Sequence, residues 1–241
     1  MHKIEKILLD ATQYKGNKEP GSKSLSGSEL NNELLQIWLR QKYGVIESDS
    51  FEQNTIGSLM HLSIQEVLKK EYLIEYSLNE KQDNGWELTG SIDLLNIKDR
   101  EIIDIKSTKQ YTVEKVLTEP DHQYIWQLSA YKFLADRYFN MDFDTKILFV
   151  LKDGGYDFRK MVNKPSLELI NITPKSHKEV LDKFNNIVEQ LSILGNEHPQ
   201  QCKDLWWRKT KTGSVPVRCM QYCSYNKVCP YYKQNPMQVN F

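Results

Sequence analysis

The spacing of hydrophobic and polar residues predicts both helices and strands in this chain. Apolar residues recur every three to four positions in four stretches, which predicts helices over residues 29–43, 56–71, 122–138 and 174–194. Short apolar runs bounded by turn residues predict strands over residues 72–78, 86–97, 101–106, 145–152, 156–162 and 167–172. Residues 111–122 read as irregular. This order of elements is compatible with a central mixed sheet flanked by helices.

Capping and turn residues place several of these boundaries. Ser28 is a candidate N-cap for the first helix, and Gly44 is expected to end it. Thr173 and Pro174 follow the order of an N-cap and a first helical residue. The Asn84–Gly85 step predicts a tight turn between two strands.

Two acids and a lysine stand inside the most apolar pair of predicted strands. Asp93 and Asp104 are surrounded by Leu and Ile, where an unpaired acid is costly to bury, so the pair requires a cation. Asp104 and Lys106 share a face because strand side chains alternate with a period of two. Such a face suits metal-assisted hydrolysis of a phosphodiester, with the acids on a divalent ion and the lysine on the attacking water. The plainer interpretation is that both acids pair with lysines.

These residues resemble the core motifs of the PD-(D/E)XK nuclease superfamily. The resemblance consists of a Gly-x-x-Asp motif ending at Asp93 and an Asp-x-Lys motif ending at Lys106. Further motifs resemble its RecB-like exonuclease branch: Gly57 to His61 upstream, Gln127 to Tyr131 downstream, and a C-terminal group of cysteines. The resemblance implies an α/β fold with a restriction-endonuclease-like core, a central mixed sheet flanked by helices and a small C-terminal cysteine metal module.

The resemblance also implies a role for each motif residue. His61, Asp93 and Asp104 would bind Mg²⁺ or Mn²⁺, with the carbonyl of Ile105 as a further ligand, and Lys106 would orient the water or help to deprotonate it. Gln127 and Tyr131, one helical turn apart, would support Lys106 or contact the DNA. The alternatives are a helix histidine bonded to a carbonyl or to water, and a surface glutamine beside a core tyrosine.

Four cysteines crowd the last forty residues: Cys202, Cys219, Cys223 and Cys229. In a chain expected to be cytoplasmic, this crowding favours a metal over disulfides, either zinc or an iron–sulfur cluster. The resemblance to the CRISPR-adaptation and AddB-like exonucleases, some of them phage-encoded, implies a 4Fe–4S cluster. Most of these relatives carry a cysteine near the N-terminus. This chain has none before Cys202, so Cys202 would be the fourth ligand. Zinc and free buried thiols are the alternatives.

A basic and aromatic stretch lies within the cysteine module. It consists of Trp206, Trp207, Arg208, Lys209 and Lys211. Cations and aromatic rings together suit a single strand of DNA, through phosphate pairing and base stacking. The alternative is that a tryptophan covers the metal site and the lysines are solvated.

The composition limits these expectations. Lys plus Arg and Asp plus Glu both number 32 in 241 residues, so net charge gives no nucleic-acid signal and a DNA-binding face has to be local. No apolar run could span a membrane and no signal peptide is evident, so we expect a cytoplasmic protein of a bacterium or a phage-infected cell. We expect a flexible segment over 1–25, a nuclease core over 26–196 and a cysteine module over 197–241.

The expected function is a metal-dependent DNA nuclease that hydrolyses phosphodiester bonds. The resemblance favours an exonuclease acting on single strands or DNA ends in recombination, replication or repair. The expected partners are DNA and a separate helicase or recombination protein, and no membrane contact is expected. The alternatives are a non-catalytic DNA-binding accessory subunit and a zinc-stapled endonuclease.

Overall fold

A computed structural model describes residues 19–46, 51–154, 156–157, 162–163, 165–205, 207–210 and 213–234. Contacts divide the chain into two compact units. One comprises Ser24–Asn31 and Ile56–Val188, and the other includes Asn32–Thr55 and Glu189–Phe241. Much of the expected flexible segment over 1–25 lies outside the described residues. The boundaries expected for the nuclease core and the cysteine module stay predictions.

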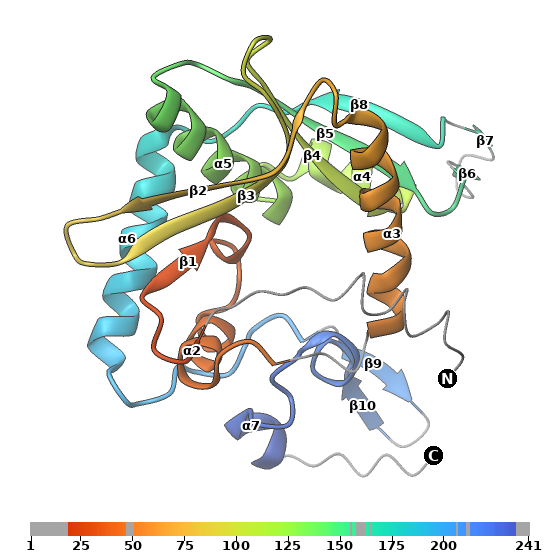
Figure 1. The fold of residues 1–241 in the computed structure, drawn as a ribbon. Coiled ribbons are helices and arrows are strands. Elements are labelled where there is room, and N and C mark those ends of the chain that lie inside the picture. Colours follow the sequence, from red (N-terminus) through yellow and green to blue (C-terminus); the bar gives the residue numbers. More distant parts are fainter. Residues whose placement is uncertain are drawn as a thin grey trace, which may run out of the picture. The chain divides into compact units, whose positions relative to one another are not determined.

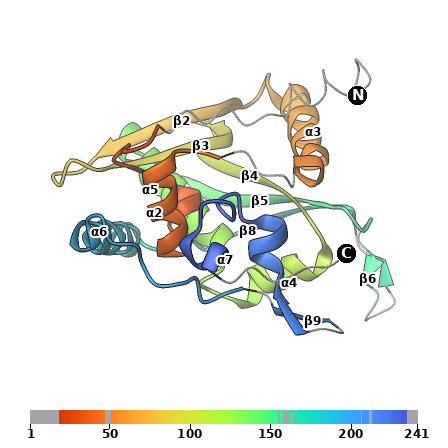
Figure 2. The same ribbon diagram turned by 90° about the horizontal axis from the view of Figure 1, so that it is seen from below.

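The unit formed by 24–31 and 56–188 is built on a six-stranded mixed sheet (Figures 1 and 2). Its strands are β1 (Ser24–Ser26), β2 (Leu73–Lys81), β3 (Glu87–Asn96), β4 (Glu101–Thr108), β5 (Asp144–Leu151) and β8 (Leu167–Asn171). The spatial order is β1-β3-β4-β5-β8, and β2 pairs with β3. The β1–β3 and β4–β5 pairs are parallel, whereas β2–β3, β3–β4 and β5–β8 are antiparallel. This arrangement confirms the expected central mixed sheet.

One edge of β3 has a gap in its strand pairing. Along the opposite edge, β2 pairs with β3 from residue 87 to residue 95 of β3. On the other edge β1 pairs with residues 87–89 and β4 with residues 94–96. The segment 90–93 therefore lies between the two, where β4 diverges from β3. Gly90 and Asp93 both fall in this opening.

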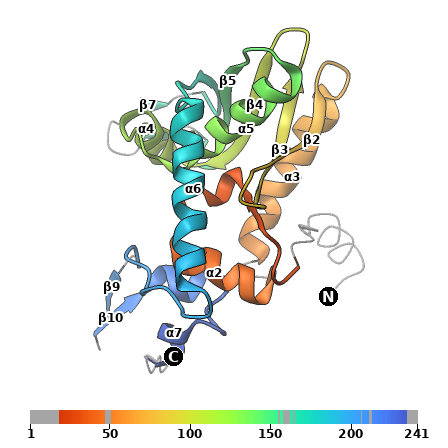
Figure 3. The same cartoon turned by 90° about the vertical axis from the view of Figure 1, so that its left-hand side faces the viewer.

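Four helices accompany the sheet: α3 (Phe51–Leu68), α4 (Gln110–Thr118), α5 (Gln123–Phe139) and α6 (His177–Leu194). Helix α3 packs Met60, Ile64 and Leu68 against a buried cluster from β3, β4 and β5 that includes Leu94 and Ile105. The first turns of α6 lie beside α5 (Figure 3), where the His177 ring meets the Phe133 ring edge-on at 5.3 Å. The helices flanking the sheet thus bury its apolar side chains.

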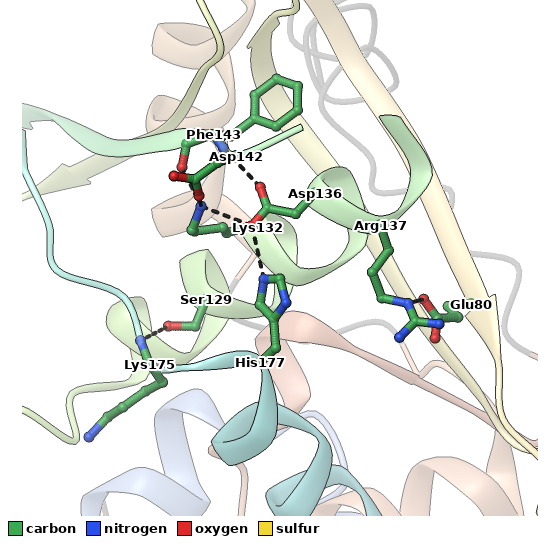
Figure 4. Close-up of polar contacts among 9 residues, drawn as sticks. All are labelled: Glu80, Ser129, Lys132, Asp136, Arg137, Asp142, Phe143, Lys175 and His177. Carbon is green, nitrogen blue, oxygen red and sulfur yellow. Dashed lines mark hydrogen bonds and ion pairs between the residues drawn. The ribbon is translucent and has the colours of Figure 1, made fainter. Parts of the chain in front are cut away.

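Helix α5 is fixed by a polar network centred on Asp136 (Figure 4). Asp136 Oδ1 accepts the Phe143 N–H at 2.9 Å, and Asp136 Oδ2 lies 2.9 Å from both Lys132 Nζ and His177 Nε2. Lys132 also donates to the Phe143 carbonyl at 2.7 Å. A separate ion pair joins Arg137 to Glu80 on β2. These contacts tie α5 to the start of α6, to the turn before β5 and to β2.

The other unit contains α2 (Leu34–Tyr43), the antiparallel pair β9 (Trp207–Thr210) and β10 (Gly213–Pro216), the π-helical turn η2 (Arg218–Tyr222) and α7 (Pro230–Gln234). The Trp38 ring of α2 meets the His198 ring edge-on at 6.3 Å, and His198 meets Tyr231 at 5.3 Å. A small hairpin elsewhere in the chain pairs β6 (Tyr156–Asp157) with β7 (Val162–Asn163).

Several predicted boundaries are confirmed. Gly44 ends α2 with φ of 74°, and Gly85 turns the chain between β2 and β3 with φ of 78°. Both values lie in the left-handed region that glycine adopts at little cost. Helix α5 begins directly after His122, as the periodicity predicts, and the His122 ring caps it by accepting the Tyr124 N–H.

Four expectations about local structure are wrong. The single strand predicted over residues 156–162 is replaced by the two short strands β6 and β7, which pair antiparallel. The first helix starts at Leu34, because the preceding residues form the 3-10 turn η1 (Gly27–Glu29) with a capping box between Ser26 and Glu29. Residues 110–118 form α4 rather than an irregular segment, since Asp153 accepts the first N–H of the helix. Helix α6 begins at His177, beyond Pro174, because Ser176 and Glu179 exchange capping bonds. Among the described residues, no helix is long and apolar enough to cross a membrane.

Candidate active site

Asp93 lies in the opening between β3 and β4 and completes the backbone hydrogen bonding there. Its Oδ2 accepts the Ile105 N–H at 2.7 Å. This N–H would otherwise be left without a partner as β4 diverges from β3, which is costly in a buried position. The divergence of the strands therefore fixes the Asp93 carboxylate beside Ile105.

Asp104 and Lys106 share a face of β4, as the strand period predicts. Lys106 Nζ lies 2.8 Å from Asp104 Oδ2 and donates to Oδ1 at 3.1 Å. Both oxygens of Asp104 therefore contact the same ammonium, and Oδ2 accepts no hydrogen bond beyond this ion pair among the described residues. Burial acts to lower the pKa of Lys106, but the charges of Asp104 and Asp93 outweigh it and raise that pKa. Lys106 is therefore a protonated cation beside the two acids.

The two carboxylates are close enough to affect one another. Burial, followed by the charge of Asp104, raises the pKa of Asp93 to about 8. Lys106 and the hydrogen bond from Ile105 oppose this shift but do not cancel it. Burial and a second nearby carboxylate both disfavour the ionised form of Asp93, and a bound cation would favour it.

His61 reaches the same place from helix α3. Its Nδ1 lies 3.7 Å from Asp93 Oδ2, and its side chain is 27% exposed. Burial and the charge of Lys106 lower the pKa of His61, while Asp104 and a hydrogen bond with the Ile105 backbone act in the opposite direction. The imidazole is therefore neutral near pH 7, the form in which it can bind a metal.

Helix α5 contributes Gln127 and Tyr131. Gln127 Nε2 lies 3.4 Å from Asp104 Oδ1 and donates to the Tyr131 hydroxyl at 2.7 Å. Burial raises the pKa of Tyr131 well above its ordinary value, so the hydroxyl keeps its proton. The predicted face shared by Gln127 and Tyr131 is confirmed, and the pair holds one oxygen of Asp104.

Two glycines make room for the Tyr131 ring. A Cβ atom on Gly90 would lie 2.8 Å from Tyr131 Cδ1, and one on Gly27 would lie 2.8 Å from the Ala130 Cβ and 3.4 Å from Tyr131 Cε1. Both Cβ positions are closer to α5 than a side chain tolerates without movement. The structure thereby links the glycine of the Gly-x-x-Asp motif to the tyrosine of the downstream motif.

Sequence reasoning missed Gly27 and also Glu75. Glu75 has φ of 49°, which is uncommon for a residue other than glycine, and its charge acts on His61, Asp93 and Tyr131. Its carboxylate accepts bonds from Gln65 at 2.7 Å and from Ser91 at 3.0 Å. No local pattern signals either residue, because both reach the site only through tertiary packing.

The four cysteines lie near one another in the second unit. Burial raises the pKa of Cys202 to about 12, and the charges of Glu33, Cys223 and Cys219 act on it. Burial raises the pKa of Cys219 to about 11, with contributions from Cys223 and Cys229. Gln36 Nε2 on α2 lies 4.0 Å from Cys223 Sγ. All four cysteines are free thiols.

The predicted DNA-binding stretch is only partly visible. Trp206 and Lys211 lie outside the described residues, and the side chains of Trp207 and Arg208 are not described. Lys209 is exposed on β9. The role proposed for this stretch stays a prediction.

Preformed metal sites are absent from the part of the chain that the structure describes, since no three His, Cys, Asp or Glu side chains converge there closely enough to hold an ion. The donor types at the sheet nevertheless suit a hard divalent cation, with two carboxylates, a neutral imidazole and a backbone carbonyl. Asp104 Oδ2, which is buried and accepts no hydrogen bond beyond its ion pair with Lys106 among the described residues, is the atom that such an ion would contact.

Comparisons with known proteins bear on the same region. Residues 70–230 match the family model of the PD-(D/E)XK nuclease superfamily, a range that begins after His61. No curated protein matches.

Solved structures resemble the chain at low identity. The crystal structure of SSO0001 is 15% identical with a TM-score of 0.60, covering 95% of this chain and 97% of that chain. An alkaline exonuclease from Laribacter hongkongensis is 14% identical with a TM-score of 0.46, covering 72% of this chain and 90% of its own. A phage-related exonuclease from Haemophilus somnus 129PT is 16% identical with a TM-score of 0.39, covering 68% of this chain and 77% of its own.

Proposed function

Because this chain belongs to the PD-(D/E)XK nuclease superfamily, we propose that it is a divalent-metal-dependent DNA nuclease. We propose further that it is an exonuclease that hydrolyses phosphodiester bonds of single strands or DNA ends. The observation that carries the proposal is the meeting of Asp93, Asp104 and Lys106 where β3 and β4 diverge. Two neighbouring buried acids have a reason to be there if they bind a cation.

Four groups would hold Mg²⁺ or Mn²⁺: the His61 imidazole, the Asp93 and Asp104 carboxylates and the Ile105 carbonyl. When bound, the metal supplies an activated water and neutralises charge that develops on the phosphate oxygens. Asp104 Oδ2 supports this ligand set, because among the described residues it is buried with no hydrogen bond beyond its ion pair with Lys106.

The remaining roles belong to side chains around the acids. Lys106 orients the attacking water, since its ammonium is a compact point charge on the same face as Asp104. Gln127 limits rotation of Asp104 through its contact with Oδ1, and Tyr131 fixes Gln127 in turn. A carboxylate held in this way needs little reorganisation in the transition state.

The experiment compares linear and covalently closed DNA, each single-stranded and double-stranded, with Mg²⁺, with Mn²⁺ and with a chelator. An exonuclease degrades only the linear forms, and both Asp104→Ala and Lys106→Ala abolish cleavage while the proteins remain folded. Cleavage of closed circles would make the chain an endonuclease. Binding of DNA without cleavage of any form would make it an accessory subunit.

We also propose that Cys202, Cys219, Cys223 and Cys229 hold a 4Fe–4S cluster, with zinc as the alternative. Thiols with pKa values of about 11 and 12 stay protonated at neutral pH, whereas a bound metal requires thiolates. Metal binding would offset the cost of ionising this buried group. An absorption spectrum of protein purified without oxygen, with iron and zinc quantified on the same sample, distinguishes four irons from one zinc.

DNA is the proposed substrate, and the stretch from Trp206 to Lys211 is a proposed contact with it. A cytoplasmic location, a role in recombination, replication or repair, and a separate helicase or recombination partner also remain proposals. A truncation is unsuited to testing them, because the cysteine-bearing unit includes segments from both sides of the nuclease motifs. Substitution of Lys209 by Ala in the full chain tests the contact through DNA affinity.

A further inference from the structure

We propose that Tyr124 is a positioning residue for Lys106, and that its ring keeps the lysine ammonium in place for turnover. The inference rests on the nuclease activity proposed above. Tyr124 lies outside all of the motifs that the sequence resemblance supplies.

The geometry is that of a cation over an aromatic face. Lys106 Nζ lies 5.0 Å from the centroid of the Tyr124 ring. Cations within about 6 Å of a ring centroid are attracted by its negative face, and more strongly when water is excluded. The Lys106 side chain is only 16% exposed, so this contact is largely shielded from water.

Lys106 needs such a contact because its other partner, Asp104, would also bind the metal. Its ammonium contacts both oxygens of Asp104, the acid that we assign to the metal. A lysine stem is flexible and its three donors rotate freely, so one partner does not fix its direction. The Tyr124 ring is a second partner that no metal ligation would compete for.

The Tyr124 ring is itself held. The His122 ring meets it edge-on with centroids 4.8 Å apart, and His122 Nδ1 accepts the backbone N–H of Tyr124 at 3.2 Å. Tyr124, Gln127 and Tyr131 follow one another on α5 at spacings of three and four residues, which puts them on one face. A single helix face thereby contacts both members of the Asp104–Lys106 pair, through Gln127 and Tyr124 respectively.

A rival role for Tyr124 is stacking on a DNA base. The side chain is half-buried rather than enclosed, and aromatic rings that bind single strands do so through their faces. Stacking would appear in DNA affinity, whereas positioning of Lys106 would appear in turnover. The two roles therefore predict different kinetic constants.

The experiment uses Tyr124→Leu and Tyr124→Phe with linear DNA. Positioning predicts a kcat lowered roughly 2- to 30-fold in Tyr124→Leu, the range that about 0.5–2 kcal/mol represents, with KM unchanged. Tyr124→Phe keeps the ring and is expected to retain wild-type turnover. The matched control is Tyr111→Leu on α4, where the ring lies 5.2 Å from Lys115 Nζ, and this variant is expected to keep wild-type kcat.

A second measurement separates positioning from stacking. In a Lys106→Ala background, Tyr124→Leu is expected to leave DNA affinity unchanged. Weaker DNA binding in that background would overturn the inference in favour of stacking. If Tyr124→Leu does not fold, Tyr124→Met, which removes the ring and keeps an apolar chain, replaces it.

The remaining outcomes are distinguishable. A wild-type chain that cleaves DNA together with a Tyr124→Leu variant of equal kcat overturns this inference alone. A wild-type chain that cleaves no DNA with Mg²⁺ or Mn²⁺ overturns the proposed function and this inference with it.

Discussion

Gly90 lies so close to the Tyr131 ring that a Cβ atom on Gly90 would be 2.8 Å from Cδ1 and 3.0 Å from Cε1 of the ring. The same Cβ would be 3.0 Å from Leu134 Cδ1. Tyr131 and Leu134 are both buried, so neither can move aside without disturbing α5. Tyr131 of the downstream Gln127–Tyr131 motif therefore requires a glycine at position 90, three residues before Asp93.

Gly90→Ala is expected to destabilise the fold by about 1–3 kcal/mol, the usual cost of overpacking a core. It is also expected to lower cleavage, because displacement of Tyr131 withdraws the partner of Gln127. Urea unfolding and steady-state kinetics measure the two effects. The control is Gly57→Ala on α3, whose nearest neighbour would be 3.8 Å away, and which should not lose stability. Equal stability of Gly90→Ala and wild type would contradict this prediction.

Tyr131→Phe is expected to keep the packing against Gly90 and to lose the hydroxyl that Gln127 contacts. Gln127 then holds Asp104 less firmly, so kcat should fall by a few-fold up to about tenfold, the loss of about 1 kcal/mol. Steady-state kinetics and thermal unfolding check this together. A variant with full activity would show that the hydroxyl has no part in holding Asp104.

Asp93 gives a pH dependence to the metal-free protein. Its pKa in the folded state is about 8, raised from 3.8, so the folded chain binds a proton that the unfolded chain has released between those values. Stability is therefore expected to fall as pH rises from about 4 to about 8, because the unfolded state binds fewer protons there. Asp93→Asn should remove this fall, and thermal unfolding in a chelator measures it.

The same variant tests the metal site. Mg²⁺ or Mn²⁺ is expected to raise the unfolding temperature of wild type, and more strongly as the pH rises through about 8, because Asp93 ionises there and the carboxylate is the form that binds a cation. Asp93→Asn should lose this stabilisation. If the variant and wild type gained the same stability from the metal, Asp93 would not be a ligand.

Asp136→Ala is expected to destabilise the fold by about 2–4 kcal/mol, because Lys132, His177 and the Phe143 N–H lose a shared buried partner. The matched comparison is Glu80→Ala, which breaks the more exposed pair with Arg137 on the same helix. That change should cost no more than about 1 kcal/mol. Urea unfolding of both variants measures the difference, and equal losses would contradict the prediction.

The sequence is sufficient to predict those parts of the site that follow from periodicity. Asp104 and Lys106 share a face because strand side chains alternate, and Gln127 and Tyr131 meet because they are one helical turn apart. Both contacts depend on spacing within single elements. The mixed sheet with flanking helices is compatible with the order of apolar stretches, but periodicity does not decide which strands pair, so that expectation rests on the family resemblance.

The features that the sequence does not predict depend on tertiary packing. Gly27 belongs to a 3-10 turn that reaches α5 across the fold, and Glu75 adopts an uncommon backbone conformation beside Asp93. Helix α4 is missed because its amphipathic pattern is short, with buried β-branched Val113 and Val116 on its inner side. Contacts between distant segments decide all three, and no local pattern records such contacts.

The opening between β3 and β4 has a consequence for how the site can be observed. Asp93 supplies the acceptor for the Ile105 N–H, so the exchange of that single amide with deuterated water reports the position of the Asp93 carboxylate. A carboxylate that turns away leaves the amide open to solvent, and exchange at residue 105 accelerates while neighbouring β4 amides stay protected. Hydrogen exchange of the Ile105 amide therefore monitors the orientation of the Asp93 carboxylate in the protein without DNA.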